Sequence, residues 1–580
     1  MSDHKPGFQD QVRSFPRQFW VVNTMEIFER MSWYGWFTVM ALYVTGSVET
    51  GGLGFTTETR GALQGIVPFF LYMFPVFTGA LADRFGYKKT FIWAYVIMML
   101  AYYLLGQFTS LPTFFLAFMF VAVGAALFKP VVVGTVAKVT TADNSSMGFG
   151  IFYMMVNVGG FAGPIVAGIM RGMGWDKVFL ACSFWAFINL IIVILFYKEP
   201  DYEESQRQGG FGKILDNMVE VLGNGRFFIT VFGVLFALMF ANIGIFDSFG
   251  WRECGIFIPV WLVLNFGWDR IMPAVSEGRP ALMQRMRCSN WRFALFLLIM
   301  SGFWTSFNQI FYTMPEYIRD FVETRPMTDF VTGIFGEDSH EKVATVSVLE
   351  HAEVVKHLGF YLNGEADGVT TSQELLLSKV RQSPAQLEAL AAEHPGDATA
   401  MAAAAIDAGR QFNPEYIVNI NAGGIVIFQV LVSFLMGRFH RFTTMIVGMT
   451  VAAVGIGMSF LAGGEGMIGL GSSVWLVAAG LLTFSFGEMM ASPTSQEYVG
   501  RIAPSEKKAL YMGYYFVAVA LGNLFGGILS GELYGKLAKE MGRPDLMWLS
   551  FGGIMLFTAL MFVAYNRFAL PRDQADGLTP

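Results

Sequence analysis

The chain has little charge for its length and few of the residue types that build metal and redox sites. Only 14% of its 580 residues are charged, and it contains 3 cysteines and 6 histidines. Cys182, Cys254 and Cys288 lie far apart and lack metal-binding or redox spacing, so neither a disulfide framework nor a zinc site is indicated. A soluble protein of this length would need more charge.

Signals of other common functions are missing as well. The net charge of −6 is small for this length, and no basic block indicates nucleic acid binding. No nucleophile–base set and no metal cluster stands out. We therefore expect no enzyme activity, no catalytic residues, no metal ligands and no cofactor.

The composition is that of a membrane protein. Apolar residues make up 54% of the chain, the mean hydropathy is +0.49, and Phe (58), Gly (64) and Met (34) are abundant. These residues are frequent in helices that face lipid or pack closely inside a bilayer. The composition predicts an all-α membrane protein.

The first long apolar segment, residues 19–43, contains Glu26, Glu29 and Arg30. If a span began after Arg30, about 16 residues would remain before the polar segment at 46–49, short of the roughly 20 that cross a bilayer. The three charges are therefore predicted to lie within the membrane. Ionisable residues there are costly and commonly mark an ion or proton route.

The apolar segments predict fourteen helices. They lie near 19–45, 61–82, 90–109, 112–138, 147–170, 177–197, 227–248, 254–269, 293–318, 415–436, 443–462, 473–499, 509–532 and 546–566, and 254–269 is the shortest. Basic residues cluster in alternate loops, for example at Arg84, Lys88 and Lys89. By the positive-inside rule these loops and both termini are expected to be cytoplasmic, which requires 254–269 to cross. A multi-pass plasma-membrane protein is expected.

Polar segments divide the chain. We predict an N-terminal six-helix bundle (1–198), cytoplasmic linkers with two accessory helices (199–291), the first helix of a C-terminal bundle (292–322), an extracytoplasmic helical insert (323–413), the remainder of that bundle (414–567) and a cytoplasmic tail (568–580). Within the insert, Ser383-Pro384-Ala-Gln386 is typical of a helix start, and an Ala-rich run follows Asp397. The insert is expected to be structural or to dock a partner outside the membrane.

Several motifs together resemble a known family. Glu26-Ile-Phe-Glu29-Arg30-Met-Ser-Trp33-Tyr34-Gly35 resembles the E-x-x-E-R-F-x-Y-Y-G signature of the proton-dependent oligopeptide transporters, a branch of the major facilitator superfamily. Further similar motifs follow in the family's order: Gly79 to Lys89, Phe128-Lys129-Pro130, Phe152 to Gly159, Gly487 to Pro493, and Met512 to Asn523. The resemblance implies the major facilitator fold, with twelve core transmembrane helices in two bundles plus the accessory pair of bacterial members.

The first motif also has a chemistry of its own. Glu26, Glu29, Arg30 and Tyr34 recur at intervals of three and four, so they share one helix face. An arginine that moved toward a substrate carboxylate would free a glutamate to take up a proton. Substrate binding and proton binding would then be coupled. The alternative is a static buried salt bridge, a poor route to stability alone.

Lys129 and Glu488 are the other charges in apolar segments. By resemblance, Lys129 works with Arg30 and Glu29 to bind a substrate carboxylate, whereas snorkelling to an interface is the alternative. Glu488 is a lone carboxylate suited to a peptide amino terminus, so the expected proton-coupling residues are Glu26, Glu29, Arg30, Lys129 and Glu488. Asn157 and Asn421 would add hydrogen bonds, and Tyr34, Tyr72, Trp304 and Tyr514 could line side-chain space, although each aromatic is more often core packing.

Some positions depart from the family pattern. Val131 stands where the family commonly has Asn, and Asn308, expected at the substrate site, stands where many members carry an acidic residue that can exchange a proton. Asn421-Ala-Gly-Gly replaces the usual Asn-Pro. Peptide is still the leading substrate, and another amino- or carboxyl-bearing solute is the alternative.

Two further groups of residues carry separate predictions. Asp83, Arg84 and Lys88 are expected to form conformational locks, and Arg438 and Arg441 either act similarly or orient their helix. Residues 363–374 follow the spacing of an EF-hand calcium loop, with oxygen ligands at Asn363, Glu365, Asp367 and Thr371, glycine at Gly368 and a glutamate at Glu374. Asn at the first position and Glu at the third depart from the EF-hand pattern. An ordinary capping box accounts for half of the pattern without metal, and calcium binding is the alternative.

The sequence therefore predicts a proton-coupled symporter that imports di- and tripeptides by alternating access. Its expected partners are small peptides, protons and the lipid bilayer. The alternatives are a transporter of another solute or a drug, and a membrane sensor that binds a ligand without transport.

Overall fold

The computed structural model describes residues 12–141, 144–199, 222–244, 248–272, 280–363, 381–436, 439–462, 473–503 and 508–569. Within these residues the chain is all-α, and all fourteen predicted apolar segments are helical. Ten helices of the described part, α11 included, are long and apolar enough to cross a membrane. The all-α membrane architecture is confirmed.

In the described part of the chain, the N-terminal bundle contains the seven helices from α2 to α8. They are α2 (Arg17–Thr45), α3 (Thr57–Met73), α4 (Pro75–Phe85), α5 (Tyr87–Leu105), α6 (Leu111–Val139), α7 (Ser145–Met173) and α8 (Trp175–Leu195). The segment predicted as one helix at 61–82 is divided at Phe74, because Pro75 begins a new helix. The segment predicted at 90–109 ends as a helix at Leu105, before Gly106.

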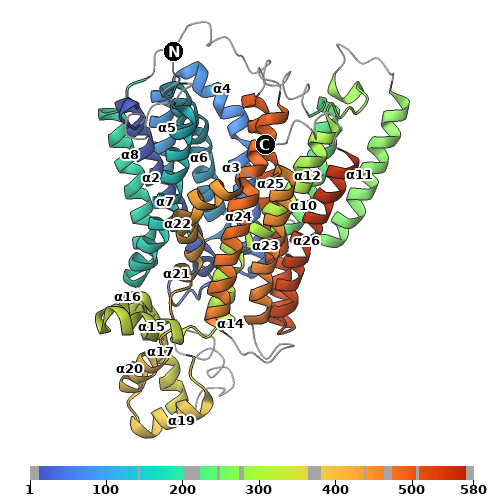
Figure 1. The fold of residues 1–580 in the computed structure, drawn as a ribbon. Coiled ribbons are helices and arrows are strands. Elements are labelled where there is room, and N and C mark those ends of the chain that lie inside the picture. The colour runs from blue at the N-terminus through green and yellow to red at the C-terminus, as the bar shows by residue number, and fades with distance from the viewer. Residues whose placement is uncertain are drawn as a thin grey trace.

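Two accessory helices, α10 (Gly225–Ile243) and α11 (Trp251–Ile271), pack as a pair beside the bundles (Figure 1). A short 3-10 turn, η2 (Ala281–Met283), follows them. Of the pair, α10 contacts α3 and shares an apolar cluster with Leu524 and Ile528 of the C-terminal bundle.

The C-terminal bundle is broken within two segments that the sequence predicts as continuous helices. Its members are α12 (Trp291–Phe307), α13 (Gln309–Tyr312), α14 (Met314–Phe321), α21 (Pro414–Val418), α22 (Ile420–Met436), α23 (Arg441–Ala462), α24 (Val474–Ile502), α25 (Lys508–Leu533) with its π-helical end η5 (Tyr534–Glu540), and α26 (Pro544–Phe568). The breaks lie at Asn308 and Thr313, where Pro315 follows, and at Asn419.

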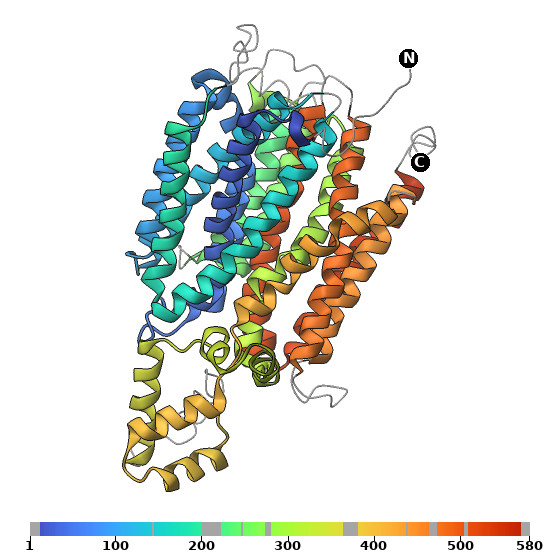
Figure 2. The ribbon, with the colours of Figure 1, turned by 60° about the vertical axis from the view of Figure 1, so that its left-hand side comes forward.

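The insert hangs from one end of the molecule, opposite the end where α2 begins and α26 ends (Figures 1 and 2). It contains α15 (Arg325–Phe335), η3 (Glu337–Ser339), α16 (His340–Val343), α17 (Val348–Leu362), α19 (Pro384–Glu393) and α20 (Ala398–Gly409). Helices α17, α19 and α20 enclose a small core that includes Leu358, Leu387 and Met401. The predicted helical character is confirmed, including the capping box at Ser383 and the cap at Asp397.

The two bundles touch most closely where α3 lies along α25. A Cβ on Gly61 would lie 2.4 Å from the carbonyl oxygen of Gly527, and a Cβ on Gly527 would lie 2.4 Å from the Cα of Gly65. Only glycine allows backbones to approach this closely, as at other small-residue helix contacts in membranes. The contact lies toward the insert, so this end of the interface is closed.

Candidate functional site

The charged face of α2 is buried against the rest of the N-terminal bundle. Arg30 lies 3.3 Å from Glu26 (Nε to Oε1) and also forms an ion pair with Glu29, and all three residues are 5% exposed or less. Gly159 of α7 packs against this helix, because a Cβ there would lie 2.5 Å from the carbonyl oxygen of Ile27. The predicted charge cluster therefore exists as one ion-paired unit.

Lys129 of α6 lies near this cluster without pairing to it. Its ammonium stands 4.5 Å from the centre of the Tyr72 ring, and its charge is close enough to act on Glu26. Among the described residues, Lys129 has no ion pair. A cation held over an aromatic ring keeps its charge available to an incoming carboxylate.

Glu488 of α24 forms the opposite pole, in the C-terminal bundle. Asn421 donates one hydrogen bond to Glu488 Oε2 and another to Ser485 Oγ, each of 3.0 Å. Glu488 is 8% exposed and has no ion pair among the described residues. A nearly buried carboxylate with only neutral hydrogen-bond partners favours a cationic ligand.

A cavity lies between the two bundles, and Glu488 is the charged residue that lines it. It brings together four predicted site residues: Tyr34 on α2, Asn157 on α7, Asn421 on α22 and Glu488 on α24. Its other lining residues are Thr38, Val156, Gly160, Pro164, Phe307, Phe311, Val418, Asn419, Ala422 and Ile425. Phe307 adjoins the predicted residue Asn308, and Asn419 is two positions from the predicted residue Asn421. This proximity in the sequence was the signal that could have identified them.

The remaining predicted contact residues do not line this cavity. The Tyr72 ring lies under the Lys129 ammonium. It also stacks on Phe516, with ring centres 6.0 Å apart. Trp304 packs against Gly522, and Tyr514 is buried in the core of the C-terminal bundle. Asn308 is buried at the break after α12, and its amide nitrogen has no hydrogen-bond partner in the described structure. Their roles in binding stay predictions.

The predicted locks are only partly described. Lys88 donates hydrogen bonds to the carbonyl oxygens of Ile194 (3.2 Å) and Tyr197 (3.0 Å), at the end of α8 in its own bundle. Arg84 is exposed, and Arg441 pairs with Glu497 at 2.9 Å within the C-terminal bundle. The Asp83 side chain, Arg438, and the EF-hand-like positions 364–374 lie outside the described residues.

Two buried ion pairs between the bundles were not predicted. Arg60 of α3 lies 2.8 Å from Glu316 of α14, and both side chains are fully buried. Arg171 of α7 lies 3.1 Å from Glu415 of α21. Both pairs lie on the insert side of the cavity, so they close that side of the molecule.

Comparisons with known proteins agree with this architecture. The family model of the Major Facilitator Superfamily matches residues 25–335 and 396–577. An uncharacterized transporter of Bacillus subtilis, YclF, is 30% identical over 32% of this chain and 38% of its own length. The peptide transporter YePEPT of Yersinia enterocolitica is 30% identical over 30% of this chain and 34% of its own length. The chain thus spans about a third of the length of these curated relatives.

Solved structures extend the likeness to the whole chain. A POT family transporter in complex with a thioalcohol conjugated peptide superposes with a TM-score of 0.61, at 17% identity, over 96% of this chain and 99% of that chain. At this identity the likeness establishes the fold.

Proposed function

We propose, for a chain that belongs to the Major Facilitator Superfamily, that it is a proton-coupled importer of di- and tripeptides that works by alternating access. The observation that carries the proposal is the placement of two poles of opposite charge preference in the two bundles. Glu488 of the C-terminal bundle lines the cavity together with Tyr34, Asn157 and Asn421. In the N-terminal bundle, Arg30 is buried with its guanidinium 6.0 Å from the ring centre of Tyr34, and Lys129 is half-buried over Tyr72. A small zwitterion, such as a short peptide, suits this arrangement.

Each end of the peptide is assigned to one of the two poles. The Glu488 carboxylate accepts the peptide ammonium group while Asn421 keeps the carboxylate oriented. Lys129 reaches the peptide carboxylate from its place above Tyr72. Similarity to the Yersinia peptide transporter supports this choice of substrate.

Proton coupling is assigned to the charge cluster on α2. Arg30 forms ion pairs with both Glu26 and Glu29. A substrate carboxylate that attracts Arg30 weakens these pairs, and a buried carboxylate without its cation takes up a proton. Asn308 cannot exchange a proton, so we assign coupling to Glu26, Glu29, Arg30, Lys129 and Glu488.

The membrane orientation is part of the proposal. The ends of α4 and α5 that carry Arg84, Lys88 and Lys89 lie opposite the insert, as does the end of α26 (Figure 1). By the positive-inside rule this face is cytoplasmic, in a bacterial plasma membrane, and the insert is outside.

Counterflow in proteoliposomes tests transport without a driving force. Vesicles loaded with unlabelled dipeptide should accumulate labelled dipeptide through wild-type protein and through Glu29→Gln, because exchange needs no net proton movement. A sensor would bind the dipeptide without exchange, and that result would overturn the proposal. Exchange of another amino- or carboxyl-bearing solute or a drug, with no peptide exchange, would reassign the substrate.

A further inference from the structure

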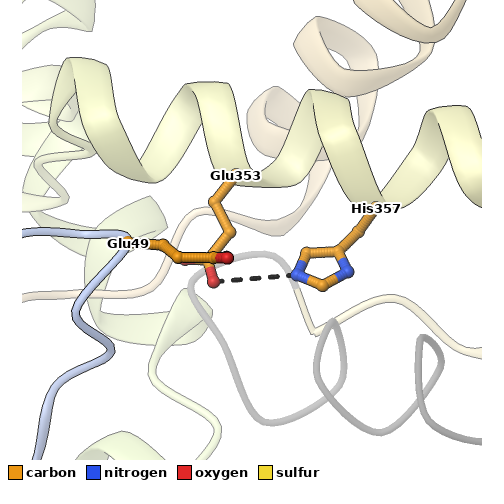
Figure 3. Close-up of side chains that lie close together, drawn as sticks. All are labelled: Glu49, Glu353 and His357. Atoms are coloured by element: carbon orange, nitrogen blue, oxygen red, sulfur yellow. Dashed lines mark ion pairs between the residues drawn. The ribbon is translucent and has the colours of Figure 1, made fainter. Parts of the chain in front are cut away.

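A cluster of metal-ligating side chains lies outside the transport site, where the insert meets the N-terminal bundle. Glu49 comes from the loop after α2, and Glu353 and His357 come from α17 of the insert (Figure 3). One ligand atom from each residue lies within 4.8 Å of the other two. Two segments about 300 residues apart in sequence therefore bring two carboxylates and one imidazole together.

The spacing on α17 already approaches that of a metal site. Glu353 and His357 are four residues apart, so they share a helix face. His357 Nε2 lies 3.6 Å from Glu353 Oε1. Two donors of a tetrahedral zinc ion, each about 2.1 Å from the metal, are about 3.4 Å apart. Small side-chain rotations are enough to reach that distance.

The charges of the cluster also favour a cation. Glu49 and Glu353 present two carboxylates to each other, and the Lys356 ammonium lies 2.8 Å from Glu49 Oε1. Lys356 is 49% exposed, so its flexible side chain can turn into solvent and leave the carboxylate to a metal ion.

We propose that Glu49, Glu353 and His357 bind one divalent transition-metal ion of the zinc class. Imidazole with carboxylate oxygens suits Zn²⁺, whereas Ca²⁺ and Mg²⁺ prefer oxygen ligands alone. The partial exposure of Glu353 (22%) and His357 (21%) leaves room for water to complete the coordination. The bound ion joins the N-terminal bundle to the insert. Without the ion, the ion pair between Lys356 and Glu49 makes this connection.

Titration of the purified full-length protein with ZnCl₂ tests the site by calorimetry and by thermal unfolding. Zn²⁺ should bind one tight site and raise the Tm of the wild type. Glu49→Gln and His357→Ala should each weaken binding at least about tenfold, the effect already produced by loss of an outer-shell partner. His351→Ala, on the same helix, is the matched control and should bind as the wild type does.

Lys356→Gln separates a metal site from a simple salt bridge. Removal of the competing ammonium should leave Zn²⁺ binding intact or tighten it, whereas Glu49→Gln should weaken it. If Zn²⁺ does not bind the wild type, or if His357→Ala binds it equally well, the proposal is wrong. Ca²⁺ that binds more tightly than Zn²⁺ would also overturn it. Neither measurement depends on transport, so the outcome is independent of the proposed function.

Discussion

The Arg60 guanidinium and the Glu316 carboxylate, 2.8 Å apart and fully buried, join the N-terminal bundle to the C-terminal bundle. Arg60 also donates hydrogen bonds to the carbonyl oxygen of Tyr312 (2.8 Å) and to Ser530 Oγ (2.6 Å). These contacts tie α3 to α13, α14 and α25 on the insert side. In the proposed transport cycle, this pair separates before the cavity opens toward the insert.

Glu316→Gln should therefore shift the protein toward an outward-open form. Loss of one partner of a buried ion pair costs roughly 3–5 kcal/mol, because the other charge stays buried and unpaired. Distances between spin labels on the insert-side ends of α3 and α25 should lengthen in this variant. The double variant Arg60→Met/Glu316→Leu should restore the closed distance, and Glu497→Gln, which breaks a pair within one bundle, should leave it unchanged. Unchanged distances in Glu316→Gln would contradict the assigned gate.

Gly61→Leu should block closure of the same interface by a different route. A side chain at this position meets the backbone of Gly527 and Gly531, and backbone cannot move aside as a flexible side chain can. Dipeptide uptake should fall by at least about tenfold, while the protein still inserts and folds because each bundle keeps its own core. Gly553→Leu is the matched control, since nothing lies within 4 Å of a Cβ there. Equal uptake by both variants would refute the role of the contact.

Glu488→Gln should weaken the transport of peptides that have a free amino terminus. A charged hydrogen-bonded pair at a buried site is worth about 2–5 kcal/mol, so KM for a free dipeptide should rise by at least about tenfold. The N-acetylated dipeptide carries no ammonium group and should be transported poorly by both proteins. Competition uptake with the two peptides checks this. An equal effect of the substitution on both would show that Glu488 does not bind the amino terminus.

The attachment of the insert should weaken in acid. Burial alone would raise the pKa of Glu323, but hydrogen bonds from Gln411 and from the backbone and side chain of Arg325 hold it below its usual value. A lowered folded-state pKa stabilises the fold above the unfolded pKa, and the contribution is lost as pH falls through the folded value. Cleavage of the insert by pepsin should therefore rise as the pH falls from about 5 through the folded-state pKa of Glu323.

The matched variant for this prediction is Glu323→Gln. It has no carboxylate to titrate, so cleavage relative to an unrelated pepsin substrate should be the same at both ends of that range. A pH dependence that persists in the variant would place the titrating group elsewhere.

The helices were predictable because each apolar segment is long enough to be recognised without its neighbours. The shared face of Glu26, Glu29 and Arg30 followed from spacing on one helix, and the structure confirms that the three residues are together. Arg60 and Glu316 could not be paired in advance, because nothing local relates two residues so far apart in sequence. The breaks at Asn308 and Asn419 were missed for a related reason, since both lie in apolar segments that read as continuous helices.

Peptide-driven proton influx tests the central claim most directly. Proteoliposomes with an internal pH dye, given a mixture of di- and tripeptides outside, should acidify with wild-type protein and with the exposed control Glu393→Gln. Glu29→Gln should abolish the acidification while counterflow continues. Peptide entry without protons, or acidification that does not require Glu29, would contradict the account.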